Sequence, residues 1–575
     1  MSIAQQKTKT LGKQFILSAF ALPVLLGFIW VPRVAAKEVE LQVGIVQRFG
    51  EENEEDKNKQ NNPQKPKNDI LTLASTQGDI LTIRFTDSKG TEQTLQTTEI
   101  TLEAVEQPLQ APTVSEKLVL GSYATFETAE DSAKQWQAKG IEVEIAQPER
   151  WEVWAKRDVY KNFLLRRLLL QSLQAQGYEQ PYLETDILAQ EIQPTFTINE
   201  QRYQSDYLEI SAGTNLIQVT AEDEPKRVYG GRLKLQPNAY GTFTLVNQVS
   251  LETYLRGVVP HEIGQGAPDK AIAAQTIIAR TYALRNLRRF AADNYELCAN
   301  THCQVYYGLS ETNARADRAI AQTKGLVLTY QNELVDALYS STTGGVTASF
   351  SDVWNGEERP YLKAVIDSPQ KVWDLSQKSL ADEATFRHFI GMKEGFNETG
   401  RNVFRWNRKA TIAELNEDLQ NYLKKRKHPL ANFKTIQKME ILERSPSGRI
   451  LTLAIQTDKG IVELQKNEVR SAFEAPRSTL FYLEPVLDQN KQLTGYAFIG
   501  GGFGHGVGLS QFGSYNLANL GWSPQQILAF YYPGTTLQPL DDSIVFGKRK
   551  KIRRRRDTEI GRRGDNFFFR STFLN

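Results

Sequence analysis

The chain has 575 residues, 40% of them hydrophobic and 10% aromatic, which is enough for several domains with packed cores. Its formal net charge of +2 hides an asymmetry, because residues 548–563 hold ten of the 69 Lys and Arg but two of the 67 Asp and Glu. The rest of the chain, with 59 basic and 65 acidic side chains, is therefore mildly acidic and precedes a basic tail at 546–575. Two cysteines exclude a disulfide-rich scaffold.

Residues 1–36 have the pattern of an export segment. Three lysines precede an apolar stretch at 15–31, and the small residues of VAA (34–36) follow it. The apolar stretch is at the short limit of what spans a bilayer, so a cleaved signal peptide is favoured over a retained inner-membrane anchor. Both interpretations place the protein outside the cytoplasm, in the periplasm or the cell wall.

The next region, 37–110, is predicted to be rich in β-strands. VELQVGIVQ (39–47) alternates apolar and polar residues as a half-buried strand does. Residues 50–69 are polar, charged and contain proline, so they predict a disordered loop. APTVSE, which begins at Ala111, predicts a linker to the following module.

Residues 113–190 predict a small βα repeat. The pattern over 118–146 indicates strand, helix and strand, and a second helix is expected from Tyr160 to Gln176. The two helix ends, WQAKG (136–140) and LQAQG (173–177), resemble each other. This region resembles a SPOR domain, a module that binds glycan strands stripped of peptides. The alternative is a generic α+β packing module.

Residues 195–545 predict a larger α+β domain. Strand patterns dominate at first, and a long helix then follows from Pro268 to about Arg289, where Pro268 suits the first helical turn. A further helix is expected at 411–425, and strands return as MEILER, ILTLAIQT and GIVELQ. The predicted fold class is therefore α+β: a β-rich domain with a long helix, preceded by the small βα module.

Four segments of this domain carry the signs of a functional site. They are LVNQVSLETYLRGVVPHEI with the helix DKAIAAQTIIARTYAL, CANTHCQVYYG (298–308), YSSTTGGVTASFSDVW (339–354), and FIGGGFGHGVGLSQFGSYNLA (498–518). In this order they resemble the SpoIID/LytB family, which comprises sporulation protein D and the amidase enhancers.

The resemblance implies a lytic transglycosylase. Such an enzyme cuts peptidoglycan between N-acetylmuramic acid and N-acetylglucosamine, leaves a 1,6-anhydro end and prefers strands without stem peptides. The glutamate of the GVV--E phrase, here Glu262, is then the catalytic acid. The alternative function is a non-catalytic, peptidoglycan-binding activator of a cell-wall N-acetylmuramoyl-alanine amidase. The partners expected are glycan strands and such an amidase, and nucleic acid is not expected.

The surroundings of Glu262 in the sequence agree with an acid role. A transglycosylase uses the 6-hydroxyl of the sugar as nucleophile, so one carboxyl serves as acid and base, and its pKa must be raised. Apolar neighbours raise the pKa of a carboxyl by disfavouring its charged form, and Val258, Val259, Pro260 and Ile263 are candidates for that wall. The alternative is that Glu262 caps the helix that follows.

Other candidates surround this acid in the family pattern. Arg280 is predicted to bind a sugar carboxylate or carbonyl or to orient Glu262, and the alternative is a solvated or salt-bridged helix arginine. Gln275 lies on the same helix with a similar role. Gly344 and Gly345 predict a sharp turn beside the substrate. In the glycine-rich loop, the candidates for substrate binding are His505, Ser510 and Gln511.

The segment CANTHC leaves three interpretations open. Some members of the family bind zinc here, and Cys298, His302 and Cys303 match three of those ligands, but the fourth is missing. A disulfide between Cys298 and Cys303 suits an exported protein, and two free thiols are the third interpretation. The expected chemistry requires no cofactor.

Overall fold

The computed structural model describes residues 39–51, 70–87, 89–221 and 224–544. The predicted export segment at 1–36 and the basic tail at 546–575 lie outside these residues, as does nearly all of the loop predicted at 50–69. No helix among the described residues is long and apolar enough to cross a membrane.

A seven-stranded sheet joins strands that are far apart in the sequence, and all of its neighbours except β1 and β15 run antiparallel. Its order is β15 (Leu297–Cys298), β1 (Glu40–Phe49), β14 (Phe243–Ser250), β13 (Arg232–Pro237), β10 (Leu208–Ala212), β3 (Leu81–Thr86) and β4 (Glu92–Thr97). The predicted regions 37–110 and 195–545 therefore contribute strands to one sheet.

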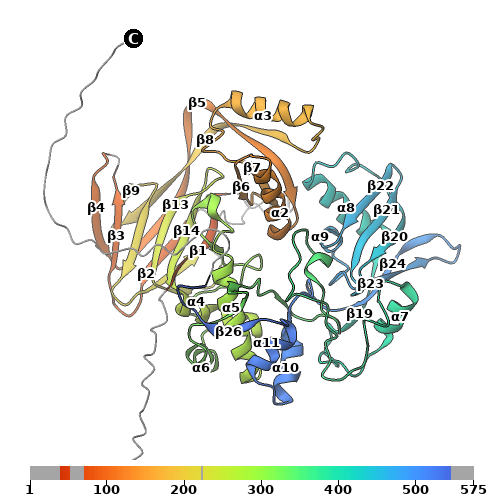
Figure 1. The fold of residues 1–575 in the computed structure, drawn as a ribbon. Coiled ribbons are helices and arrows are strands. Elements are labelled where there is room, and N and C mark those ends of the chain that lie inside the picture. Colours follow the sequence, from red (N-terminus) through yellow and green to blue (C-terminus); the bar gives the residue numbers. More distant parts are fainter. Residues whose placement is uncertain (1–38, 52–69, 88, 222–223, 545–575) are drawn as a thin grey trace, which may run out of the picture. The chain divides into compact units, whose positions relative to one another are not determined.

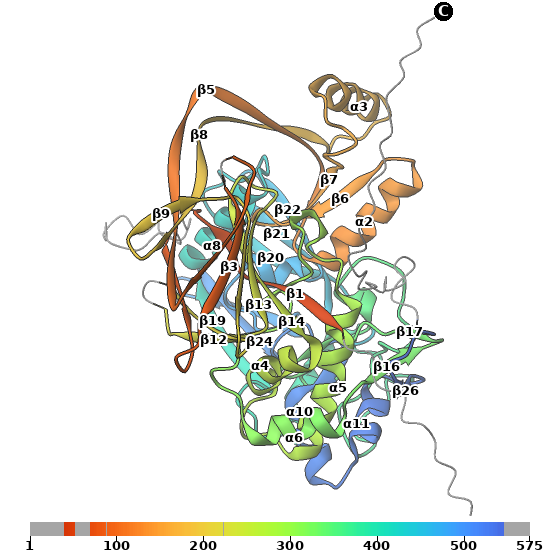
Figure 2. The ribbon, with the colours of Figure 1, turned by 90° about the vertical axis from the view of Figure 1, so that its left-hand side faces the viewer.

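A second sheet leads from this β-rich part to the βα module. Its order is β12 (Arg227–Gly230), β11 (Leu216–Ala221), β2 (Ile70–Ser75), β5 (Glu99–Tyr123), β7 (Trp151–Ala155) and β6 (Val143–Ala146), and β8 (Tyr182–Ile198) pairs with β5 and with β9 (Gln201–Gln204). The antiparallel ribbon of β5 and β8 is the connection, which Figure 2 shows from the side.

The prediction that APTVSE forms a linker is wrong, because these residues lie within β5. The sequence suggested a linker because the strand pairing is interrupted here: the register of β5 against β8 shifts between Pro108 and Thr113. Proline lacks the N–H that a ladder needs, so the sequence signals an interruption that the structure accommodates as an irregularity inside one strand.

The βα module contains the helices α2 (Phe126–Ala138) and α3 (Phe163–Ala175). The strand, helix and strand predicted for 118–146 are present as the end of β5, α2 and β6. Helix α2 buries Ala129, Ala133 and Trp136, which are spaced along one helical face. The likeness of this module to a SPOR domain stays a prediction.

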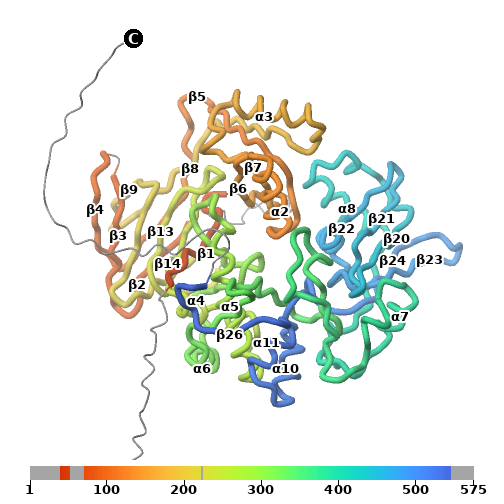
Figure 3. The backbone as a smooth tube through the Cα atoms, in the orientation of Figure 1, coloured from red at the N-terminus to blue at the C-terminus, as the bar shows by residue number. Residues whose placement is uncertain are grey.

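The long helix predicted from Pro268 is α5 (Asp269–Arg285), with Pro268 as its N-cap residue. Its residues are buried from Ala271 to Leu284, so it is a core helix and not an amphipathic surface helix. The helices that contact it are α4 (Leu251–Ile263), α6 (Ala314–Gln322), α10 (Gln511–Asn519) and α11 (Pro524–Tyr531). Figure 3 shows the blue chain of α10 and α11 beside the green chain of α5.

The region 405–501 packs around a separate hydrophobic core, which includes Leu415, Leu419, Ile455 and Phe498. Its strands are β19 (Arg405–Thr411), β24 (Leu493–Gly501) and β23 (Phe481–Leu487) in one sheet, and β20 (Ile436–Arg444), β21 (Ile450–Thr457) and β22 (Gly460–Gln465) in another. Its helices are α8 (Ile412–Lys425) and α9 (Glu468–Ala472), and α7 (Glu383–Gly391) precedes it. The helix and the three strands expected here are confirmed.

Short strands tie the remaining segments together. One sheet consists of β17 (Glu333–Leu334), β16 (Leu326–Tyr330) and β26 (Thr536–Pro539). A parallel pair of β18 (Tyr339–Ser340) and β25 (Leu509–Ser510) places the glycine-rich loop beside the segment that begins at Tyr339. Two of the four segments singled out in the sequence are thereby brought into contact.

Candidate active site

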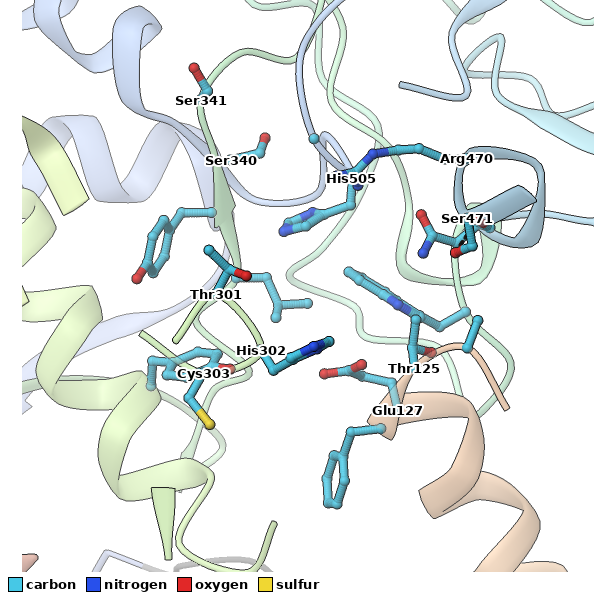
Figure 4. A pocket seen from close by; sticks show the side chains of 18 of the residues that line it. Thr125, Glu127, Thr301, His302, Cys303, Ser340, Ser341, Arg470, Ser471 and His505 are labelled. Carbon is cyan, nitrogen blue, oxygen red and sulfur yellow. Dashed lines mark hydrogen bonds between the residues drawn. The ribbon is translucent and has the colours of Figure 1, made fainter. Parts of the chain in front are cut away.

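A cavity of about 590 Å³ brings together residues from all four of these segments. The sequence candidates that line it are Glu262, His302, Cys303, His505 and Gln511. The βα module contributes Thr125 and Glu127, and the region 405–501 contributes Arg470 and Ser471. Figure 4 shows these last four side chains around the same space as His302 and His505.

Glu262 lies in the last turn of α4. The helix begins at Ser250, whose hydroxyl accepts a hydrogen bond from the Thr253 N–H, and it ends before Gly264, which has φ +79°. The last carbonyls of a helix have no partner within it. Here the Gln511 amide donates to the Glu262 carbonyl at 2.6 Å, and the Tyr515 hydroxyl donates to the Ile263 carbonyl. Helix α10 therefore fixes the end of α4 that presents the acid.

The Glu262 carboxyl is partly buried, and burial raises its pKa to about 6. Hydrogen bonds from the Val305 N–H, at 2.8 Å, and from the Tyr339 hydroxyl oppose that rise in pKa. Desolvation outweighs both bonds, and no basic side chain of the described residues contributes a stabilising charge to the carboxylate. Val258, Val259 and Ile263 are buried, as expected of an apolar wall. A pKa near 6 lets one carboxyl serve as both acid and base near neutral pH.

His505 is neutral. Its burial, with Arg470 and Arg449 nearby, lowers its pKa to about 3. The ring nitrogen Nδ1 accepts a hydrogen bond from the Val507 N–H at 3.0 Å, so the proton of the neutral ring lies on Nε2. Trp354 packs against the ring at 5.0 Å between centroids. The ring N–H donates to the backbone carbonyl of Tyr339, so His505 holds the segment that carries Tyr339, and no bond joins His505 to Glu262.

The second carboxylate of the cavity is already paired. Glu127 of α2 forms an ion pair with Arg289, whose side chain is 4% exposed. Arg289 also donates to the carbonyl of His302 at 3.1 Å, which ties the βα module to the CANTHC segment. Among the described residues that line the cavity, Glu262 is therefore the one carboxyl without a basic partner.

Arg280 has the geometry of the alternative interpretation, a salt-bridged helix arginine. The Arg280 guanidinium is fully buried, pairs with Glu252 through two hydrogen bonds of 2.8 Å and donates to the Leu326 carbonyl. It does not line the cavity, and it has no hydrogen bond to Glu262 among the described residues. The physical reason is its position on a buried helix, where a cation requires an acid of its own. Gln275 is also fully buried, away from the cavity lining, and its side-chain amide has no described partner.

Gly344, Gly345 and Ser510 also lie outside the cavity lining. The two glycines form the expected turn, with φ +76° and +88°, but their N–H groups point at the buried carboxylate of Glu398. Ser510 donates to the same carboxylate at 2.6 Å. In the structure these three residues hydrogen-bond to the buried Glu398 side chain beneath the glycine-rich loop, and their contact with substrate stays a prediction.

Cys298 and Cys303 form a disulfide, with 5.6 Å between their Cα atoms. A disulfide removes both thiolates that a zinc ion would need, and the described residues contain no group of three or more His, Cys, Asp or Glu arranged to hold a metal. Of the three interpretations of CANTHC, the structure therefore has the disulfide. The short loop that it closes leads directly to Val305, which bonds to Glu262.

Sequence reasoning missed several residues of the cavity. Tyr339 bonds to Glu262, and Gln304 supports the Tyr339 hydroxyl at 3.2 Å. Both belong to segments already singled out, so their proximity to the motif was an available signal. Arg470 and Glu127 had no such signal, because only the packing of α9 and α2 brings them to the cavity.

Comparisons with known proteins match two parts of the chain that contribute to this cavity. A family model described as stage II sporulation protein matches residues 239–330, and a domain of unknown function (DUF8618) matches 348–508. An amidase enhancer of Bacillus subtilis is 28% identical over 359 residues, covering 54% of this chain and 47% of the relative. Stage II sporulation protein D of the same organism is 27% identical over 331 residues, covering 54% of this chain and 81% of the relative.

By these matches the chain resembles the SpoIID/LytB family of sporulation protein D and the amidase enhancers, over about half of its length. It spans about half the length of the amidase enhancer that it matches. This similarity supports a role connected with the cell wall.

Proposed function

We propose that this chain is a peptidoglycan lytic transglycosylase that cleaves between N-acetylmuramic acid and N-acetylglucosamine and leaves a 1,6-anhydro end. One observation carries this proposal: Glu262 is a partly buried acid with a pKa of about 6, and it has no second free carboxyl beside it among the described residues of the cavity. We also expect strands without stem peptides to be the preferred substrate.

A single carboxyl favours an internal nucleophile. Glycoside hydrolases that use water generally need two carboxyls, one as acid and one as nucleophile or base. In the proposed reaction, protonated Glu262 gives its proton to the glycosidic oxygen as the bond to the anomeric carbon breaks. The 6-hydroxyl oxygen of the same muramic acid bonds to that carbon, and the Glu262 carboxylate takes the hydroxyl proton. The acid is thus regenerated without water or a cofactor.

The surrounding residues fit the handling of a sugar polymer. Neutral His505 lines the cavity and, through its bond to the Tyr339 carbonyl, holds the residue whose hydroxyl bonds to Glu262. A second cavity, of about 720 Å³, shares Ala124, Thr125 and Asn467 with the first. It lies between the βα module and the region 405–501, so space for further sugar units adjoins the cavity of Glu262.

The second candidate function is activation of a cell-wall amidase without catalysis. The observation in its favour is the similarity to an amidase enhancer. In that case the cavity would bind glycan, and Glu262 would not act as a catalytic acid.

The test is a digest by the purified protein without any amidase. Intact and peptide-stripped peptidoglycan are incubated with the wild type, with Glu262→Gln, and with Glu463→Gln as a control at an exposed glutamate of β22. Mass spectrometry should find anhydro-ended fragments with the wild type and the control, and a loss of about 10²-fold or more with Glu262→Gln. Absence of cleavage by the wild type, with glycan binding retained, would contradict the enzyme and favour the activator.

A further inference from the structure

Arg470 is a cation without a counter-ion in the cavity of Glu262. It lies in α9 and extends beside His505, as Figure 4 shows. No hydrogen bond or ion pair joins its guanidinium to any of the residues that the structure describes. The other arginine of the lining, Arg289, is paired with Glu127. Arg470 is thus the one unpaired arginine or lysine in the described lining.

The other groups around Arg470 do not compensate its charge. His505, beside it, is neutral. Glu262 carries no charge in its protonated, reactive form. The pKa of Arg470 is shifted downward by burial, and no charged group among the described residues contributes to this shift. A partly buried cation that is left unpaired disfavours folding, so such a group signals a ligand with the opposite charge.

Two other polar atoms of the cavity also lack partners. The hydroxyl of Ser340 has no hydrogen-bond partner, and only 7% of this residue is exposed. The side-chain oxygen Oδ1 of Asn467, three residues before Arg470, also has no partner. Buried polar atoms are normally satisfied in folded proteins. They indicate a polar ligand rather than an apolar one: the Asn467 oxygen calls for a donor on the ligand, and the Arg470 guanidinium calls for an anionic group.

We propose that Arg470 binds the lactyl carboxylate of N-acetylmuramic acid and thereby selects glycan strands whose stem peptides have been removed. This inference rests on the proposed function and identifies the group of the substrate that the site recognises. A planar guanidinium matches a carboxylate with two parallel hydrogen bonds. In intact strands the same carboxyl is an amide and carries no charge, so the strongest contact is lost.

The proposal also gives a role to the domain of unknown function. Arg470, Asn467 and His505 all lie within its match at 348–508, and all three line the cavity of Glu262. Under this proposal the region supplies substrate selection, whereas α4 supplies the acid.

The experiment compares three substrates: stripped strands, stripped strands whose carboxyls have been converted to methylamides, and intact strands. Stripped strands carry the lactyl group as their carboxylate, so the methylamide removes that one charge. The variants are Arg470→Gln, Arg470→Lys, and Arg408→Gln as a control with the same charge change at an exposed position of β19. Cleavage gives kcat/KM, and calorimetry gives the affinity of each variant in a Glu262→Gln background.

We expect Arg470→Gln to lower kcat/KM and affinity for stripped strands about tenfold or more, as for loss of a charge-assisted bond. The methylamide should weaken the wild type by a similar factor and leave Arg470→Gln unchanged. Arg470→Lys should recover part of the loss, and Arg408→Gln should behave as the wild type. The thermal midpoint of Arg470→Gln should not fall, which distinguishes recognition from a structural role.

An equal effect of Arg470→Gln on stripped and methylamide strands would overturn the proposal. A loss confined to intact strands would also overturn it, because the carboxylate bound would then belong to the stem peptide. If the wild type does not cleave at all, the proposed function fails, and the affinities in the Glu262→Gln background still decide the role of Arg470.

Discussion

The side-chain amide of Gln511 donates a 2.6 Å hydrogen bond to the backbone carbonyl of Glu262, 249 positions earlier in the chain. The bond joins the glycine-rich loop to the end of α4, where a carbonyl has no helical partner. Gln511 was expected to bind substrate, and it lines the cavity, but its amide also holds the backbone of the proposed acid. The two most distinctive motifs of the sequence thus meet at one hydrogen bond.

Substitution of Gln511 by alanine tests that bond. We expect Gln511→Ala to lower kcat by about tenfold through misplacement of Glu262, and to cost about 1 kcal/mol in the free energy of unfolding. Initial rates of anhydro product and urea denaturation measure the two effects. Gln525→Ala, at an exposed position of α11, is the matched control and should change neither. A loss of stability with unchanged kcat would show that the bond does not position the acid.

The pH dependence of cleavage follows from the pKa of Glu262, which is about 6. The protonated carboxyl is the reactive form, so kcat/KM should fall about tenfold for each pH unit above that value. His505, with a pKa of about 3, stays neutral throughout and contributes no limb to the profile in this range. A profile measured from pH 4 to 9 whose basic limb begins near the ordinary value for glutamate would contradict a buried acid.

The pair of Arg280 and Glu252 should stabilise the fold without serving catalysis. Glu252→Gln leaves a fully buried guanidinium without its acid, and we expect a loss of about 3 kcal/mol or more in the free energy of unfolding. Arg280→Met should cost less, because the Glu252 side chain is 28% exposed and water can hydrate it. Chemical denaturation gives both values. At a temperature where both variants are folded, kcat should equal that of the wild type, and a selective loss of kcat in Arg280→Met would restore a catalytic role.

The disulfide between Cys298 and Cys303 should support the loop that leads to Val305. We expect Cys298→Ser with Cys303→Ser to destabilise the protein by about 2 kcal/mol, as for a short closed loop. Alkylation without reductant, followed by mass spectrometry, should find neither thiol modified in the wild type. Stoichiometric zinc in the purified protein, with both cysteines reactive after chelation, would favour the zinc interpretation instead.

The sequence predicted those features that depend on local patterns. Strands β21 and β22 match ILTLAIQT and GIVELQ, because apolar and polar residues alternate clearly in both. Helix α5 begins where Pro268 indicates. The apolar neighbours of Glu262 correctly indicated a raised pKa, since burial in this case follows from adjacent residues.

Features that depend on distant partners could not be predicted in the same way. The motif containing Arg280 is conspicuous, but its partner Glu252 lies 28 positions away on a different helix. The turn at Gly344 and Gly345 suggested a ligand, and its ligand is Glu398 of the chain itself. Arg470 carries no motif at all, and its place in the cavity results from the packing of a separate hydrophobic core.

The most direct test of the account is cleavage of stripped glycan strands in water enriched in oxygen-18. Attack by the 6-hydroxyl of the sugar consumes no water, so the new anhydro ends should carry no label and should be lighter than a hydrolysed end by one water molecule. Glu262→Gln should abolish these ends, and Glu463→Gln should leave them unchanged. Reducing ends that carry the heavy oxygen would contradict the account, because water would then be the nucleophile and a second catalytic base would be required.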